Sequence, residues 1–342
     1  MEPLELGLDT FGDVTAAPDG RVLSHAQVIR HVIEEGVLAD QVGVDFFGVG
    51  EHHRHDFAIS APEVVLAAIA GRTRRIKLGS AVTVLSSDDP VRVFQRFATL
   101  HAAARGRAEV ILGRGAYTES FPLFGYELAQ YGALFDEKLE LFVALLKGGS
   151  ITWEGKLRPR LAGQQVYPSM GEAALKTWIA VGSTPQSVLR AARFGLPLML
   201  GIVGGETRRF RPFIDMYRRA SDTVPGPPQP VGVHSPGHVA DSDARAREEY
   251  WTAYQPARDA LGRERGWPPI TRAKFDVEVE RGALYVGSPE TVARRIVETV
   301  KELGVSRFDL KYSTGLLPHE ALLRSIELYG TRVAPLVRQK LA

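Results

Sequence analysis

Short apolar runs alternate with longer amphipathic segments along most of the chain. The runs contain few polar positions, as expected for parallel strands that are buried on both faces. They predict strands at residues 4–9, 43–49, 76–85, 108–115, 176–183, 196–202, 231–240 and 306–313. Between or after these strands, apolar residues recur every three or four positions, which predicts helices.

Start signals place several of the helices. Ser24 is an expected N-cap for a helix over 24–42, and Pro62 falls in the first turn of a helix over 61–72. Asp89 followed by Pro90 combines a favoured N-cap with a favoured first helical residue. A further helix is expected near 134–147.

Strands and helices in this order favour a (β/α)8 TIM barrel, with a doubly wound open sheet as the alternative. The length of 342 residues suits a single barrel domain over 1–342. Residues 148–175 and 255–285 exceed a minimal repeat and are expected to form lids or edge structure. We therefore predict insertion loops at the C-terminal face of the barrel.

Composition excludes several classes of protein. Lys plus Arg (42) nearly balances Asp plus Glu (40), which gives no basis for binding nucleic acid or a membrane surface. The absence of cysteine excludes disulfides and thiolate chemistry and fits a cytoplasmic protein. The acidic N-terminus is unlike a signal peptide, and no apolar run approaches the roughly 18 residues of a membrane span.

The segment "EHHRHDF" directly follows the second predicted strand. In a barrel the loops after the strands build the active site, so His52 or His53 is a candidate for proton transfer or hydrogen bonding. A metal site needs three or four converging ligands, whereas adjacent residues at a strand end point in opposite directions. We therefore predict no metal, and a polar loop without chemistry is the alternative.

Small residues end the third predicted strand. Gly79, Ser80 and Ala81 stand where a strand would normally carry larger side chains. They would allow a flat ligand to approach the backbone closely, although a glycine at this place can also simply relieve packing.

Arg114 lies between two glycines just past the fourth predicted strand. Burying a guanidinium there is costly unless it meets an anion or an acid. A ligand anion and a carboxylate such as Glu51 are both candidate partners.

The segment "VGSTPQSVL" predicts a helix start with free backbone N–H groups. Gly182 and Ser183 leave amides unpaired, Thr184 is the expected N-cap, and Ser187 adds a hydroxyl on the first turn. Such an end is suited to a phosphate. A rival start at 286–295 carries an acidic residue in its first turn, which would repel an anion, so we favour the first.

Taken together, these stretches resemble the bacterial-luciferase-like, flavin-dependent monooxygenase family. The resemblance covers residues 4 to 335 and rests on the order of "GVGEHH", "LGSAVTVLSSDDPVRVFQRFATLHAAARGRAEV", "GRGAYTESFPLFG", "WIAVGSTPQSVLRAARFGLPLML" and "SRFDLKYSTGLLPHEALLRSIELYG". It implies a (β/α)8 barrel that uses reduced FMN, supplied by a separate flavin reductase, and O2. The implied substrate is a small organic molecule, aldehyde-like or similar.

Two other functions remain open beside this one. Some relatives use a deazaflavin and transfer hydride, so a deazaflavin-dependent dehydrogenase or reductase is an alternative. The other is a non-catalytic flavin-binding protein. A homodimer is also expected, because luciferase-like proteins commonly pair.

The resemblance also assigns roles to individual residues. Glu51 and His52 match the family's acid and catalytic histidine, and Ala81–Val82 matches a non-proline cis peptide beneath the flavin ring. Arg114 matches a flavin phosphate contact, and Thr184 and Ser187 match its hydroxyl partners. We place the phosphate at these three residues and Ser183.

Two positions depart from luciferase itself. Gly113 replaces the cysteine before the arginine, and no second phosphate arginine occurs near Tyr131. Light emission is therefore not expected.

Overall fold

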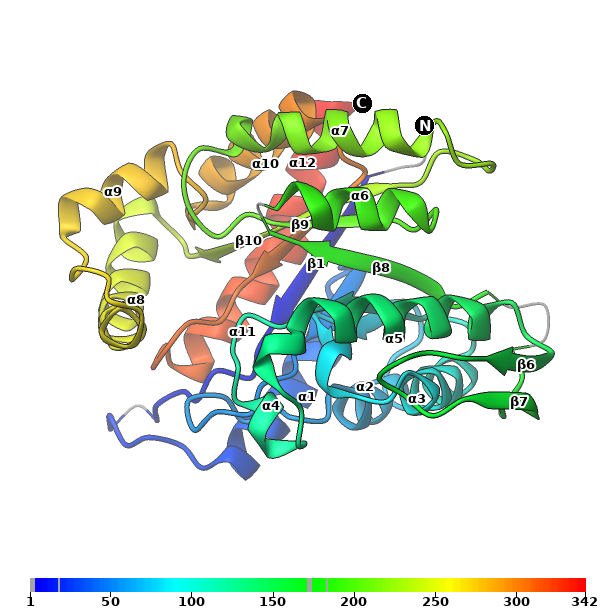
Figure 1. Cartoon of the computed structure of the whole chain (residues 1–342). Helices are drawn as coiled ribbons and strands as arrows, with labels where there is room; N and C mark the ends of the chain where they lie inside the picture. The colour runs from blue at the N-terminus through cyan, green and yellow to red at the C-terminus, as the bar shows by residue number, and fades with distance from the viewer. Residues whose placement is uncertain (1–3, 18, 171–173, 183) are drawn as a thin grey trace.

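The computed structural model describes residues 4–17, 19–170, 174–182 and 184–342, and a closed parallel barrel forms its centre (Figure 1). Its eight strands are β1 (Glu5–Thr10), β2 (Phe46–Val49), β3 (Lys77–Ser80), β5 (Ala108–Gly113), β8 (Lys176–Val181), β9 (Leu198–Gly201), β10 (Val231–Val239) and β12 (Arg307–Lys311). Each strand pairs in parallel with the next, and β12 pairs with β1 to close the ring. The (β/α)8 prediction is confirmed, and the open-sheet alternative is wrong.

Helices surround the barrel, most of them on its outer side (Figure 1). They are α1 (His25–Gln41), α2 (Pro62–Ala70), α3 (Pro90–Ala103), α4 (Ser120–Leu123), α5 (Tyr131–Leu146), α6 (Pro185–Arg193), α7 (Arg211–Ser221), α8 (Asp243–Arg265), α9 (Arg272–Glu280), α10 (Pro289–Leu303), α11 (His319–Leu328) and α12 (Ala334–Leu341). Short 3-10 turns lie at Leu85–Ser87, Leu128–Gln130 and Thr207–Phe210, and a π turn at Tyr329–Val333 joins α11 to α12.

The start signals read from the sequence are confirmed. Ser24 caps α1 and forms a capping box with Gln27. The Asp89 carboxylate accepts the backbone N–H of Val91 and Arg92 at the start of α3. Within the described ranges, no helix is long and apolar enough to cross a membrane.

The third predicted strand, 76–85, is in fact two strands. β3 ends at Ser80, β4 (Thr83–Val84) pairs with β5, and the Ala81–Val82 peptide between them is cis. The Ala81 N–H donates to the carbonyl of Val49 (2.8 Å), and the Val82 carbonyl accepts the Glu51 N–H (3.1 Å). These two bonds tie the break in the strand to the end of β2.

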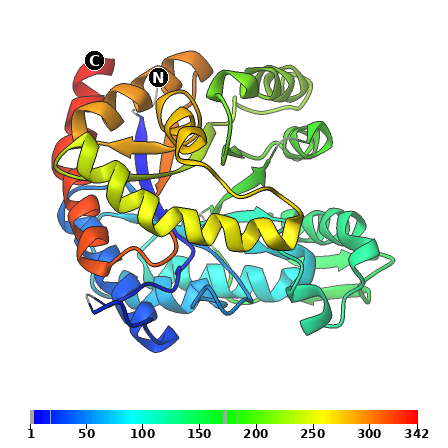
Figure 2. The same ribbon diagram turned by 90° about the vertical axis from the view of Figure 1, so that its left-hand side faces the viewer.

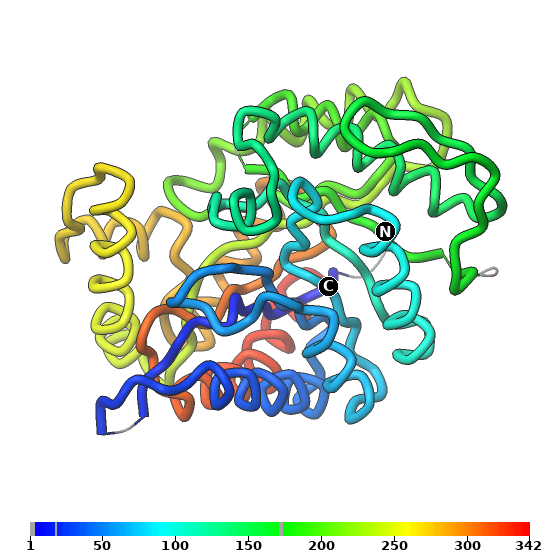
Figure 3. Tube along the Cα trace, turned by 60° about the horizontal axis from the view of Figure 1, so that its bottom comes forward, coloured from blue at the N-terminus to red at the C-terminus, as the bar shows by residue number. Residues whose placement is uncertain are grey.

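The two long insertions lie in different places. Residues 148–175 contain the hairpin of β6 (Ser150–Trp153) and β7 (Leu161–Gln165), and backbone N–H groups beside it donate to Glu137 of α5. The hairpin is therefore edge structure on the outside of the barrel, far from α8 and α9 (Figure 3). Helix α8 instead lies across the C-terminal face, where an insertion was expected (Figure 2).

Large side chains fill the middle of the barrel. Phe46, Ile111, Trp178 and Met199 form a buried cluster there. A Cβ on Gly79 would lie 2.8 Å from the Phe46 ring, so this glycine makes room for packing. The expectation that Gly79 admits a flat ligand is therefore wrong, and the packing alternative holds.

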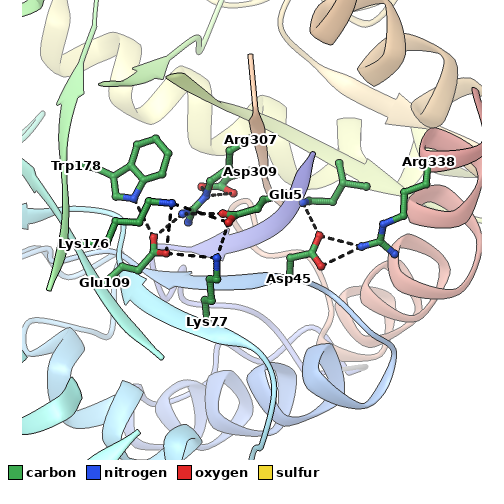
Figure 4. A network of polar contacts seen from close by, with 10 residues as sticks. Glu5, Asp45, Lys77, Glu109, Lys176, Trp178, Arg307, Asp309 and Arg338 are labelled. Carbon is green, nitrogen blue, oxygen red and sulfur yellow. Dashed lines mark hydrogen bonds and ion pairs between the residues drawn. The ribbon is translucent and has the colours of Figure 1, made fainter. Parts of the chain in front are cut away.

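Charged residues occupy the N-terminal end of the barrel below this cluster (Figure 4). Arg307 is 0% exposed and donates to both carboxylate oxygens of Asp309 at 3.0 Å. It also donates to Glu109 (2.6 Å), which accepts the indole N–H of Trp178 (2.9 Å). The cluster and these ion pairs fill the barrel interior below the C-terminal ends of the strands.

Candidate active site at the C-terminal face

A cavity of about 330 Å³ opens at the C-terminal ends of the strands. Every barrel strand or the loop after it contributes to the lining, which includes Asp9, Phe11, Glu51, His52, Ala81, Val82, Gly113, Arg114, Gly182, Ser187, Gly201, Val203, His234 and Asp309. The volume falls within the range of small-molecule sites. Its place is the one where barrel enzymes carry their active sites.

Glu51 is buried and holds two neighbours in position. One carboxylate oxygen lies 2.9 Å from Nε2 of His53, and the other accepts the backbone N–H of Val84 (2.8 Å). Glu51 therefore fixes the segment that follows the cis peptide. The alternative pairing of Glu51 with Arg114 does not occur.

His52 lies in an aromatic environment at the cavity wall. Its ring contacts Phe11 (centroids 4.7 Å apart), Phe57 (4.3 Å) and Tyr117 (5.3 Å). Burial among these rings lowers the pKa of His52 to about 3, so the imidazole is neutral at physiological pH. Its Nε2 atom is buried and, among the described residues, has no hydrogen-bond partner. A buried polar atom at a cavity wall is a candidate ligand contact.

Arg114 lies beside hydroxyl groups rather than a carboxylate. Its guanidinium donates to Ser187 (3.1 Å) and Thr184 (3.4 Å), and it stacks on Tyr131 at 4.9 Å from the ring centre. No carboxylate within the described part of the chain forms an ion pair with it. Arg114, Tyr131 and the start of α6, which are far apart in the sequence, therefore come together at one corner of the cavity.

The start of α6 has no side-chain cap. Thr184 is the N-cap residue, as expected, but its hydroxyl caps no backbone N–H and instead donates to Ser187 (2.8 Å). At the rival α10, Ser288 caps the Thr291 N–H, and Asp243 accepts the Ser288 N–H. Helix α6 thus combines an uncapped start with a nearby cation, whereas α10 is capped and has an acid beside it.

The remaining predicted cofactor contacts fall in different places. Ala81, Val82 and Gly113 form one wall of the cavity, and Gly182 lines it beside α6. Ser80 does not line the cavity; it is 0% exposed and its hydroxyl donates to the Ile111 carbonyl (3.1 Å) of β5. Ser183 lies outside the described residues.

Sequence reading missed a second guanidinium at the Arg114 corner. Arg190, one turn after Ser187 on α6, reaches the Ser187 hydroxyl (3.4 Å) and also forms an ion pair with Asp136. The helical spacing of Ser187 and Arg190 was the available signal, because residues three apart share a face.

It also missed a polar group on the other side of the cavity. His234 of β10 lies 2.7 Å, through Nδ1, from a carboxylate oxygen of Asp9 of β1. Asp309 of β12 lines the cavity beside them, and burial raises its pKa to about 7. The signal was a charged or titratable residue inside an otherwise apolar strand, which is expensive unless it has a use.

The histidines of "EHHRHDF" do not converge. His53 pairs with Glu51, His52 packs among aromatic rings, and the His55 carbonyl contacts the ring of His25. Across the described residues, no group of three or more His, Asp or Glu side chains is placed to hold a metal ion.

Comparison with known proteins identifies the family. The family model described as luciferase-like monooxygenase matches residues 10–307. The chain belongs to this family. Its members are flavin-dependent oxidoreductases, so the protein is a flavin-dependent enzyme of the luciferase-like monooxygenase type.

Individual relatives differ in substrate and cofactor. The N-acetyl-S-alkylcysteine monooxygenase of Bacillus subtilis is 26% identical over 289 residues, covering 79% of this chain and 83% of the relative. The oxygenating constituent of 3,6-diketocamphane monooxygenase from Pseudomonas putida, solved with FMN, has a TM-score of 0.78 at 20% identity over 97% of this chain and 98% of that one. An F420-dependent secondary alcohol dehydrogenase has a TM-score of 0.76 at 17% identity, covering 98% and 99%. A flavin-type cofactor is therefore supported, and its identity is not decided by the fold.

Proposed function

We propose that this protein uses reduced FMN and O2 to oxygenate a small organic substrate. A separate flavin reductase would supply the reduced FMN, in keeping with a relative described as an oxygenating constituent. Aldehydes and alkyl thioethers are the first substrates to test, the latter because a relative is an N-acetyl-S-alkylcysteine monooxygenase.

The main support for this proposal is the Arg114 corner, the part of the cavity formed by Arg114, Thr184 and Ser187. A guanidinium with two hydroxyl partners, beside an uncapped helix start, offers charge and donors to a phosphate. Arg190 adds a second positive group near Ser187 and takes the place of the phosphate arginine that the sequence lacks near Tyr131.

The rest of the cavity suits a flat ring system. Ala81, Val82 and Gly113 are small or compact, and a Cβ on Gly113 would lie 2.6 Å from the Val82 side chain. Glu51 holds the backbone that follows this wall, through the Val84 N–H. Bound reduced FMN would supply the electrons that activate O2.

His52 would then act as a hydrogen-bonding group rather than an acid. Its neutral imidazole presents Nε2, which has no partner among the described residues, at a wall formed by aromatic rings. A neutral imidazole in such a site can orient a reacting oxygen without delivering a proton.

Absorption spectroscopy tests the proposal. We expect oxidised FMN to bind with a perturbed visible spectrum, and reduced FMN to be consumed with O2 when a substrate is present. Tight binding of coenzyme F420 with no FMN binding would contradict it and favour a deazaflavin-dependent dehydrogenase or reductase, for which the F420-dependent neighbour is the specific support. FMN binding without turnover on any aldehyde or thioether would favour a flavin-binding protein.

The single-domain organisation, the homodimer and the cytoplasmic location remain predictions. Analytical ultracentrifugation with and without FMN would test the homodimer directly.

A further inference from the structure

Two histidines border the same cavity in opposite environments. The His52 ring packs against aromatic rings, whereas His234 is held by a carboxylate. Phe11 lies between them, with ring centroids 4.7 Å from His52 and 5.8 Å from His234, and its ring stacks on His234 at 10°. The two imidazoles therefore share one wall of the cavity, but their proton chemistry differs.

The geometry of His234 fixes which nitrogen faces the cavity. Nδ1 lies 2.7 Å from Oδ2 of Asp9, so Nδ1 carries a hydrogen towards the carboxylate. Among the described residues none hydrogen-bonds to Nε2, while the side chain keeps 14% exposure and lines the cavity. Nε2 is thus the free end of a carboxylate–imidazole pair at the cavity, where it could contact a bound ligand.

The charged groups near this pair come from β1 and β12. Asp9 of β1 and Asp309 of β12 are the acidic neighbours, and the other oxygen of Asp9, Oδ1, has no partner within the described residues. Lys311 of β12 is the cationic neighbour; it contacts the Phe11 ring (4.6 Å) and pairs with Asp13 (2.9 Å). On β9, Gly201 lies beside His234 and adds no charge.

We propose that His234, held by Asp9, is the proton donor of the oxygenation reaction. In this step the imidazolium transfers its Nε2 proton to the oxygen atom that is released with a negative charge. The Nε2–H bond breaks, its electron pair stays on nitrogen, and a new O–H bond forms. Water entering at the cavity mouth returns the proton to Nε2 after product release. The inference rests on the proposed oxygenase function and assigns its acid to a residue other than His52.

The titration behaviour of the two histidines agrees with this division. Burial alone would lower the pKa of His234, but the Asp9 carboxylate beside it raises the pKa above the usual range. Because a raised pKa extends the pH range over which His234 is protonated, activity should be full at lower pH and fall as the pH rises through that pKa. At His52, burial outweighs the opposing effect of Asp13 and lowers the pKa to about 3, so this imidazole is unsuited to the same task.

Histidine NMR of the protein without cofactor tests the charge directly. The His234 ring signal, assigned by its loss in His234→Asn, should titrate above pH 6.5, and Asp9→Asn should lower its midpoint by about 1 pH unit or more. A His234 ring that is neutral at pH 6 in the wild-type protein would overturn the inference. This measurement needs no flavin, no substrate and no turnover.

Kinetics test the role. With FMN, NADH, a flavin reductase and an alkanal or alkyl thioether that turns over, His234→Asn should lower turnover by about 10²–10⁴-fold and flatten the high-pH fall, with FMN affinity nearly unchanged. Asp9→Asn should move that fall to lower pH, an effect that a merely structural role would not produce. Turnover of His234→Asn equal to wild type would refute the inference, whereas failure of the wild-type protein to bind FMN would refute the proposed function instead.

The same strand offers a matched control. His238 of β10 also forms a buried histidine–carboxylate pair, with Glu249 at 2.8 Å, but it does not line the cavity. His238→Asn removes an equivalent pair and should leave both turnover and its pH profile unchanged. A loss of turnover in this control as large as that in His234→Asn would show that pair removal acts through the fold and would overturn the assignment.

Discussion

The arginines at the two ends of the barrel have different partners. At the N-terminal end, Arg307 faces Asp309 and Glu109, so opposite charges cancel inside the protein (Figure 4). At the C-terminal end, Arg114 meets only hydroxyl groups and an aromatic ring, and Nε2 of His52 meets no partner among the described residues. Nη2 of Arg307 and Oε2 of Glu5 also lack partners among the described residues, but they belong to residues that form ion pairs. Burying a polar group without a partner costs free energy, so the unpaired groups that line the cavity indicate where a ligand completes the structure.

The largest effect is expected on stability, at the N-terminal end of the barrel. Arg307→Met leaves the Glu109 and Asp309 carboxylates without their cation, and we expect a loss of about 3–5 kcal/mol in the free energy of unfolding. Urea denaturation measures it. The control is Arg338→Met, because Arg338 pairs with Asp45 at 2.9 Å but is 46% exposed, and such pairs contribute about 1 kcal/mol or less. Equal losses in both variants would erase the distinction between a buried network and a surface pair.

The next largest effect is expected on turnover, at the C-terminal end of the barrel. His52→Ala removes a hydrogen-bonding group at the cavity wall, and we expect turnover to fall about 10²–10³-fold with FMN affinity nearly unchanged. Single-turnover kinetics with chemically reduced FMN measure both quantities. His55→Ala should cost little, because its ring does not line the cavity. If His53→Ala fails while His52→Ala turns over normally, the catalytic histidine is the partner of Glu51 and not His52.

Affinity for the phosphate should show a smaller effect. Arg114→Ala should weaken FMN binding by about 1.5–3 kcal/mol, roughly 10- to 100-fold, because hydrogen bonds to charged groups contribute that much. Riboflavin, which lacks the phosphate, should bind almost as before. Fluorescence titration with both ligands gives the comparison. Arg193→Ala is the control, since Arg193 lies on the same helix but its side chain is 72% exposed. Equal weakening of FMN and riboflavin would mean that Arg114 only supports the fold.

The fold could be predicted because its signals are local. Eight apolar runs and their intervening helices fixed the order of elements, and capping residues such as Ser24 and Asp89 marked helix starts within a residue. The break in the third strand escaped that pattern, since β3 and β4 are divided by hydrogen bonds to β2 that only the closed barrel supplies. Gly79 was misread for the same reason, because its neighbour Phe46 comes from another strand.

Some residues of the candidate site could also be predicted from the sequence, and others could not. Glu51, His52, Arg114 and Ser187 stood out because they follow strands or begin a helix, where barrel chemistry is expected. Asp9 and His234 did not, because they lie within apolar strands and meet across a separation of 225 positions. Their pairing depends on β12, which lies between β1 and β10 in the barrel.

The smallest expected effect separates the two helix starts. Ser187→Ala removes one hydroxyl from the Arg114 corner, and we expect FMN binding to weaken by about 0.5–1.5 kcal/mol, with riboflavin unaffected. Ser288→Ala, its counterpart at α10, should leave FMN affinity unchanged while lowering the unfolding free energy by about 0.5–2 kcal/mol, because Ser288 caps its helix. The two variants should therefore have different effects. Ser187→Ala should weaken ligand binding, because this hydroxyl faces the cavity, and Ser288→Ala should lower stability, because this hydroxyl caps its own helix. Weaker FMN binding in Ser288→Ala, measured by the same titration, would place the phosphate at α10.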